Sequence, residues 1–175
     1  MSDEFPSLEA EFEAAKELYA QVGFMTILWA RMEGTLDLIN RLLFYHAGGS
    51  RFEDRFPLAL DRKLTFLRRC HRDLPELVSI QEAGFQLIDL VHTLKEQRHD
   101  IIHGDAETMP VTKMELVVLK RAKQDKQAIL GHQKYVDGDD LNHFIDQVLS
   151  LLELCSKHSH AVAEVVLADS DQNPG

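Results

Sequence analysis

A heptad-like stripe of apolar residues between positions 80 and 102 constrains the fold of this chain more than any other feature of its sequence. The stripe comprises Ile80, Gly84, Leu87, Val91, Leu94, Arg98 and Ile101. Residues spaced in this way share one side of a helix, so the stripe predicts a long helix that faces a core or a partner helix. Arg98 occupies a position where the stripe requires an apolar side chain. Because an unpaired buried guanidinium is costly, Arg98 is either paired inside a bundle or lines a cleft that receives an anion.

Both ends of this predicted helix can be recognised in the sequence. Pro75 suits its first turn, and Gly104 provides a stop directly after the segment Arg-His-Asp-Ile-Ile-His at 98–103. His99 and His103 fall in the last turn, where the helix dipole favours protonated imidazoles. The end of the helix therefore carries a guanidinium and two imidazoles.

Apolar periodicity predicts further helices on both sides of this one. The expected ranges are about 7–22, 24–45, part of 51–74, and 140–167, with a bend or break at Gly23 and a stop at Gly48-Gly49-Ser50. Residues 112–136 are instead rich in β-formers and predict a hairpin or two short strands. We therefore expect a mainly α chain: an up-and-down bundle of four to five helices with a small β-hairpin insert near 113–136. A single domain over 7–168 is expected between disordered tails at 1–6 and 169–175.

Composition narrows the class of protein. The chain has 175 residues, of which 45% are hydrophobic, enough for one core, and no apolar run reaches the ~18 residues of a membrane span. The first residues lack the apolar segment of a secretory signal, and Cys70 and Cys155 fit neither a disulfide framework nor a metal knuckle. We therefore expect a cytoplasmic protein with reduced thiols and no membrane partner. The net charge of −10 argues against broad nucleic-acid binding but leaves room for a local basic groove.

Two further groups of charged residues can serve either structure or substrate binding. Glu33 belongs to a polar strip on the helix expected at 24–45, and this strip is either solvated or directed towards Arg98. Arg68, Arg69 and Arg72 lie in the locally basic segment 51–74. They form either an exposed face paired with acidic helices or a positive wall that guides a phosphate backbone.

Motifs for metal, cofactor and nucleophile chemistry are incomplete or missing. Residues 96–99 match the Glu-x-x-His element of di-iron bundles, but a single copy cannot complete the ligand set, so we expect no metal site. The sequence contains no glycine-rich phosphate loop and no Gly-x-Ser-x-Gly, and neither cysteine lies in a nucleophile motif. We therefore expect no cofactor.

Arg98 and His103 remain as the pair best suited to chemistry. On a straight helix they would lie about 140° apart, but Gly104 loosens the last turn and arginine is long, so both can address one cleft. A near-neutral imidazole can remove the 2′-OH proton of RNA, and a guanidinium can stabilise the charge that builds on the phosphate. Water or a protonated His99 can serve the leaving oxygen, so the scheme requires no metal.

The segment 98–103 resembles the Arg-x4-6-His signature of the HEPN superfamily, in which a polar residue usually follows the arginine, as His99 does here. The order of elements is also similar, with a long first helical region, a motif at the end of a later helix and then a final helix. The resemblance implies an all-helical domain that homodimerises with its two motifs facing each other. It also implies either a metal-independent ribonuclease of a toxin–antitoxin, phage-defence or RNA-processing setting, or a module that keeps the fold for binding.

Three hypotheses follow. In the first, the chain is a dimeric RNA endonuclease in which Arg98 binds the scissile phosphate, His103 is the base, and His99 or Asp100 orients or assists. In the second, a non-catalytic HEPN-like dimer binds a protein partner or a nucleotide through the same cleft; an antitoxin or a nucleotidyltransferase would fit the family. In the third, a helical interaction domain pairs Arg98 with Glu33 or Asp100, and His103 caps the helix.

Overall fold

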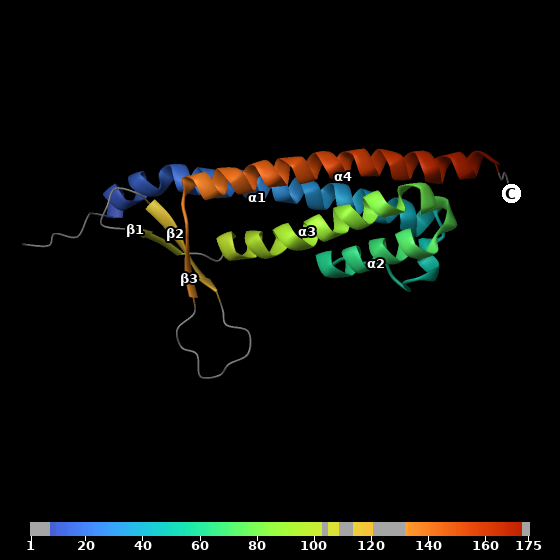
Figure 1. Cartoon of the computed structure of the whole chain (residues 1–175), viewed down its shortest axis with the longest axis horizontal. Helices are drawn as coiled ribbons and strands as arrows, with labels where there is room; N and C mark the ends of the chain where they lie inside the picture. The colour runs from blue at the N-terminus through green and yellow to red at the C-terminus, as the bar shows by residue number, and fades with distance from the viewer. Residues whose placement is uncertain (1–7, 103–104, 109–113, 121–131, 173–175) are drawn as a thin grey trace, which may run out of the picture. The chain divides into compact units, whose positions relative to one another are not determined.

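The computed structural model of the chain describes residues 8–102, 105–108, 114–120 and 132–172. Its elements, in chain order, are α1 (Leu8–His46), the 3-10 turn η1 (Gly49–Arg51), α2 (Leu60–Asp73), the 3-10 segment η2 (Pro75–Ile80), α3 (Gln81–Ile102), β1 (Asp105–Thr108), β2 (Met114–Lys120), β3 (His132–Val136) and α4 (Gly138–Gln172) (Figure 1). The described chain is mainly helical, which confirms the predicted class. No helix within these ranges is both long and apolar enough to span a bilayer.

The described residues form two compact units. Unit 1 combines the chain up to Ile27 with Leu94–Gln147, and unit 2 combines Leu28–Thr93 with the chain from Val148 onwards. The helices α1, α3 and α4 each contribute one segment to each unit. The single domain expected over 7–168 stays a prediction, and the tail expected at 1–6 lies outside the described residues.

Helix α1 continues without interruption through Gly23, where the sequence predicts a bend or a break. A glycine inside a helix costs only about 1 kcal/mol relative to alanine. Leu18 and Met25 are buried on either side of it and anchor the helix. A Cβ placed on Gly23 would meet no heavy atom within 4 Å, so crowding does not explain this glycine.

The end of α1 agrees with the predicted stop. The helix ends at His46, and Gly48 follows with a φ of +70°, a left-handed conformation that glycine adopts at little cost. A Cβ on Gly49 would lie 2.6 Å from the carbonyl oxygen of Leu43. The chain therefore turns back against the last turn of α1 at a distance that only glycine allows.

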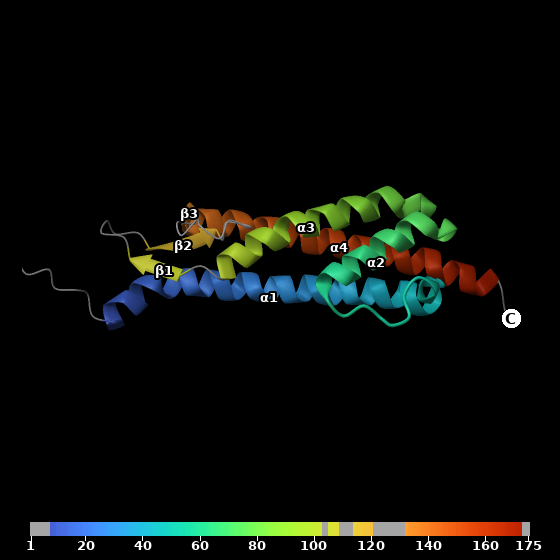
Figure 2. The ribbon, with the colours of Figure 1, turned by 90° about the horizontal axis from the view of Figure 1, so that it is seen from below.

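Unit 2 is a helical bundle in which α2 and segments of α1, α3 and α4 lie side by side (Figures 1 and 2). Its core is made of large apolar side chains from all four helices. The most deeply buried include Trp29, Met32, Leu36, Ile39, Leu43, Leu64, Phe66, Leu67, Ile88, Val91, Val148, Leu151 and Val162. An ion pair between Lys63 and Asp37 joins α2 to α1 at the edge of this core.

Unit 1 contains the three strands, which form an antiparallel sheet in the order β1-β2-β3. The central strand β2 pairs with both others: its Val117 pairs with Asp105 of β1, and its Leu116 pairs with Val136 of β3. The strands β2 and β3 lie where the sequence predicts β structure, whereas β1 is not predicted. The connection over 121–131 lies outside the described residues, so the hairpin itself stays a prediction.

Helix α4 begins at a site that its sequence explains. The Asp140 backbone N–H donates to the Asp137 carboxylate over 2.9 Å, and the Asp137 N–H lies 3.4 Å from the Asp140 carboxylate, which is the reciprocal arrangement of a capping box. The helix extends to Gln172, beyond position 169 where the disordered tail is predicted to begin.

The heptad-like stripe is buried within the chain itself. In unit 2, Gly84, Leu87 and Val91 are buried, and in unit 1 so are Leu94 and Ile101. The stripe therefore needs no partner helix to cover it. The homodimer stays a prediction that rests on the resemblance alone.

Candidate functional site

Three of the four predicted catalytic residues lie at the C-terminal end of α3, in unit 1. The helix remains regular through Ile102, as the sequence predicts, and its last turns hold Arg98, His99 and Asp100. Arg98 is half-buried with its Nε atom buried, whereas the side chain of His99 is exposed. His103, the fourth predicted catalytic residue, lies outside the described residues.

Asp100 points to another side of the helix than Arg98. Two residues along a helix correspond to a rotation of about 200°, so these two side chains leave α3 in nearly opposite directions. Asp100 lines a polar pocket of about 170 Å³ formed within unit 1. The pocket is completed by Gln97, Ile101, Val136, Asp140, His143, Phe144 and Gln147. Arg98 is not among its lining residues, so the pocket brings Asp100 together with His143 but not with the guanidinium.

Sequence reasoning missed two of the four α4 residues that line this pocket. His143 and Gln147 are four residues apart and therefore share one face of α4 with Asp140. That spacing could have indicated a polar face, although it could not have shown that Asp100 lies opposite. Because Asp140 also takes part in the capping box of α4, its carboxylate already has a structural role.

Arg68, Arg69 and Arg72, which were proposed to guide a phosphate backbone, each bond to a carboxylate or a backbone carbonyl of unit 2. Arg68 pairs with the Asp89 carboxylate, and Arg72 donates to Asp73 over 2.7 and 2.9 Å. The hydrogen bond from Arg72 lowers the pKa of Asp73 below its ordinary value. Arg69 donates to the Phe52 carbonyl oxygen over 3.2 Å. These contacts match the structural alternative, an exposed face paired with acids, while a role in binding RNA stays a prediction.

Glu33 accepts a hydrogen bond of 2.6 Å from the indole N–H of Trp29, one turn earlier on α1. Trp29 is buried, and a buried indole needs an acceptor for its single donor. Glu33 is itself half-buried, so it supports the core of unit 2. Its proposed contribution to substrate binding stays a prediction.

A pair of buried histidines is the polar feature of unit 2 that the sequence did not indicate. The Nε2 atoms of His71 on α2 and His158 on α4 lie 2.9 Å apart, which is a hydrogen bond. Burial lowers the pKa of His71 to about 4, with His158 adding to the shift, and burial also lowers the pKa of His158. Both rings are therefore neutral near pH 7. Eighty-seven residues separate them, so no local pattern could have joined them.

The two cysteines are free and fully buried, as expected for reduced thiols. Burial raises the pKa of Cys70 and of Cys155 to about 12. A thiol with so high a pKa holds almost no thiolate at neutral pH, so neither residue is suited to nucleophilic catalysis. Within the described residues, no three histidine, cysteine or acidic side chains are grouped as metal ligands.

Comparisons of the chain with models of protein families, with curated proteins and with solved structures found no significant match. The site is therefore interpreted from its own residues and geometry.

Proposed function

We propose that the chain is a metal-independent RNA endonuclease of HEPN type that acts as a homodimer in the cytoplasm. One observation carries the proposal: α3 stays helical to Ile102, and its last turns hold the half-buried Arg98 and the exposed His99. A partly buried guanidinium at the end of a helix is held in place yet can still reach an anion. The Arg-x4-His order places the proposed general base, His103, five residues after this arginine in the sequence.

The proposed reaction transfers the phosphate within RNA. His103 removes the proton of a 2′-OH, whose oxygen attacks the adjacent phosphorus while the bond to the 5′-oxygen of the next nucleotide breaks. Arg98 stabilises the charge on the non-bridging oxygens. A protonated His99, or water, delivers a proton to the departing 5′-oxygen. The products are a 2′,3′-cyclic phosphate and a free 5′-OH, so no metal is needed.

Asp100 has a different place in this proposal from the one that the sequence suggested. Because it leaves α3 nearly opposite Arg98 and lines the pocket with His143, we assign it no direct contact with the phosphate. The arginines at 68, 69 and 72 are already engaged with groups of unit 2, so they contribute at most a secondary attraction to RNA.

Cleavage of a fluorescently labelled single-stranded RNA in EDTA tests the proposal. Purified wild-type protein should cleave it, and His103→Ala should lower the rate at least about 100-fold, the usual contribution of a general base. Arg98→Ala should lower it to a similar extent. His92→Ala and Arg62→Ala, at exposed positions on α3 and α2, are the matched controls and should keep full activity. Cleavage that survives in both active-site variants would come from a contaminant and would refute the proposal.

The alternative is a non-catalytic HEPN-like module that binds a protein partner, such as an antitoxin or a nucleotidyltransferase, or a nucleotide. The net charge of −10 and the engaged arginines of α2 favour it over a broad RNA-binding surface. If no RNA is cleaved but Arg98→Ala weakens binding of a nucleotide or a partner, this module is the better description.

A further inference from the structure

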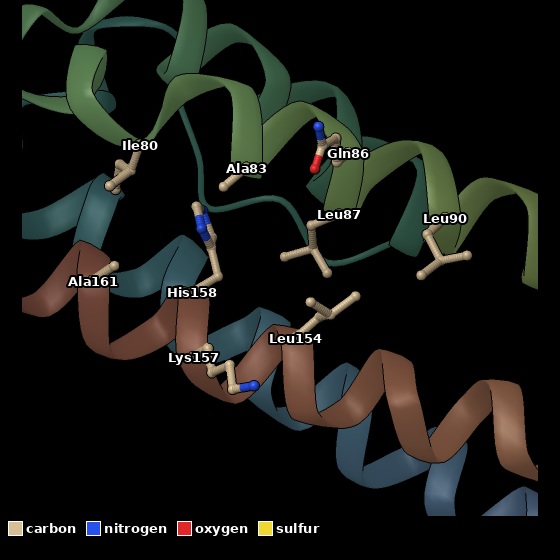
Figure 3. Close-up of a pocket in the computed structure, with 9 residues that line it drawn as sticks. All are labelled: Ile80, Ala83, Gln86, Leu87, Leu90, Leu154, Lys157, His158 and Ala161. Atoms are coloured by element: carbon tan, nitrogen blue, oxygen red, sulfur yellow. The ribbon is translucent and has the colours of Figure 1, made fainter.

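An apolar pocket of about 440 Å³ lies in unit 2, between α3 and α4. It is lined by Ile80, Ala83, Gln86, Leu87, Leu90, Leu154, Lys157, His158 and Ala161. Figure 3 shows Leu87 and Leu90 of α3 facing Leu154 of α4, with the ring of His158 rising from α4 towards Ile80 and Ala83. Its size and apolar lining lie within the range of small-molecule sites in proteins.

The buried histidine pair supplies this pocket with one defined hydrogen-bond donor. The Nδ1 atom of His71 is buried and makes no hydrogen bond within the described part of the chain. A buried N–H without an acceptor is rarer than an unused acceptor, so this Nδ1 carries the lone pair and His71 donates through Nε2. His158 therefore accepts through its Nε2 and carries its own proton on Nδ1. Since His158 is 94% buried and lines the pocket, this N–H is the donor that the pair offers to an occupant.

Charges at the rim of the pocket are already neutralised by neighbouring groups. The Lys157 ammonium pairs with the Glu153 carboxylate at 2.6 Å, and Figure 3 shows it directed away from the apolar side chains. The amide of Gln86 donates to Glu82 over 3.1 Å. An anionic ligand would meet no unpaired cation among the lining residues, and a cationic ligand would meet no carboxylate among them. The rim therefore favours a neutral occupant.

We propose that this pocket binds a small neutral apolar molecule with a single hydrogen-bond acceptor, such as an aryl ketone. The acceptor oxygen takes the Nδ1–H of His158, and the apolar body packs against Leu87, Leu90 and Leu154. The site belongs to unit 2 and uses no residue of the Arg98 motif, so this proposal does not depend on the proposed ribonuclease activity.

Three probes of nearly equal shape test the proposal: 2-acetylnaphthalene, 2-ethylnaphthalene and 2-naphthoate. Each is titrated into ¹⁵N-labelled full-length protein, and affinity and site are read from the backbone amide shifts. The ketone should bind about threefold to tenfold more tightly than the ethyl compound, since one net hydrogen bond contributes about 0.5–1.5 kcal/mol. The shifted amides should lie around positions 80–90 and 154–161. Tightest binding by the carboxylate, shifts mapping elsewhere, or no binding of any probe would overturn the proposal.

Two variants separate pocket filling from hydrogen bonding. Ala83→Phe fills the pocket from its exposed wall and should weaken the ketone at least tenfold, whereas Ala30→Phe, at an exposed position of α1 outside the pocket, should not. His158→Phe keeps an aromatic ring but removes the donor, so the ketone should lose its advantage over the ethyl compound. If His158→Phe does not fold, the two alanine variants still decide the matter, because equal binding by both would refute the site.

Discussion

The ring of His71 fits into unit 2 because residue 84 has no side chain. A Cβ on Gly84 would lie 2.5 Å from the Cδ2 and Nε2 atoms of His71, closer than any real contact. The ring cannot easily move away, because Gln81 donates to its backbone carbonyl over 2.7 Å and its Nε2 is bonded to His158. Gly84 therefore has a packing function inside a helix, where glycine is otherwise unfavourable.

Gly84→Ala should lower the free energy of unfolding by about 1–2 kcal/mol. Overpacking a core costs roughly 1–3 kcal/mol, and the better helix propensity of alanine offsets part of that loss. Gly34→Ala is the matched control on α1, because a Cβ there would meet no heavy atom within 4 Å, and it should gain about 0.5–1 kcal/mol. Urea unfolding followed by circular dichroism measures both. Equal stability of the two variants would show that the His71 ring can move aside.

The same histidine pair should make the fold sensitive to acid. The folded-state pKa of His71 is lowered from 6.5 to about 4, so the unfolded chain binds more protons than the native one between these values. Stability should therefore be complete above about pH 6.5 and fall as the pH drops towards 4, by up to about 3 kcal/mol at roughly 1.4 kcal/mol per pH unit. Urea unfolding of wild type and His71→Gln across this range isolates the effect from the carboxylates. If the stability of wild type and of His71→Gln fell in parallel with pH, the acid sensitivity would not come from His71.

At the scale of elements, the first turn of α4 depends on two carboxylates that bond to each other's backbone. Asp137→Ala should cost about 1 kcal/mol, the usual loss for a helix N-cap. Asp139→Ala is the control, since Asp139 is exposed in the same turn and takes no part in this capping box, so its favourable interaction with the helix dipole is worth a few tenths of a kcal/mol. Urea unfolding gives the two costs, and amide exchange at 138–141 should accelerate only in the first variant. Equal effects would mean that charge, not capping, stabilises this turn.

Most helices could be predicted because their signals are local. Periodicity, the glycines after His46 and the acids before α4 all act within a few residues of the element that they define. The strand β1 could not be predicted, because Asp105–Thr108 has no β-forming pattern and becomes a strand through its pairing with β2. The bend or break predicted at Gly23 does not occur, because burial of the neighbouring residues outweighs the local cost of one glycine.

The site itself was less predictable than the fold. The position of Arg98 at a helix end followed from the stripe and from Gly104. Helical geometry explains two further features. Arg98 and Asp100 are two residues apart and so face nearly opposite sides of a helix, and Trp29 and Glu33 are four apart and so can bond on one face. Both could have been predicted from the sequence. The pocket around Asp100 and the pair of His71 with His158 join residues far apart in sequence, which only the tertiary packing brings together.

At the scale of the whole molecule, the open question is whether two chains build one catalytic cleft. Burial of the stripe within one chain removes the argument that α3 needs a partner helix, so the dimer must be tested by itself. Light scattering should give twice the 20.0 kDa mass of the chain at micromolar concentration. A particle of single-chain mass would exclude a composite site.

Mixing two inactive variants should then restore activity. In a homodimer with one shared cleft, random exchange of Arg98→Ala and His103→Ala chains makes about half of the dimers mixed. Each mixed dimer keeps one arginine and one histidine across the interface, so the RNA that neither variant cleaves alone should be cleaved by the refolded mixture. An affinity tag on one variant, with co-purification of the untagged variant, shows that the refolded mixture contains mixed dimers. If the two chains co-purify but the mixture stays inactive, the arginine and the histidine must act within the same chain, and the facing motifs implied by the resemblance would be wrong for this protein.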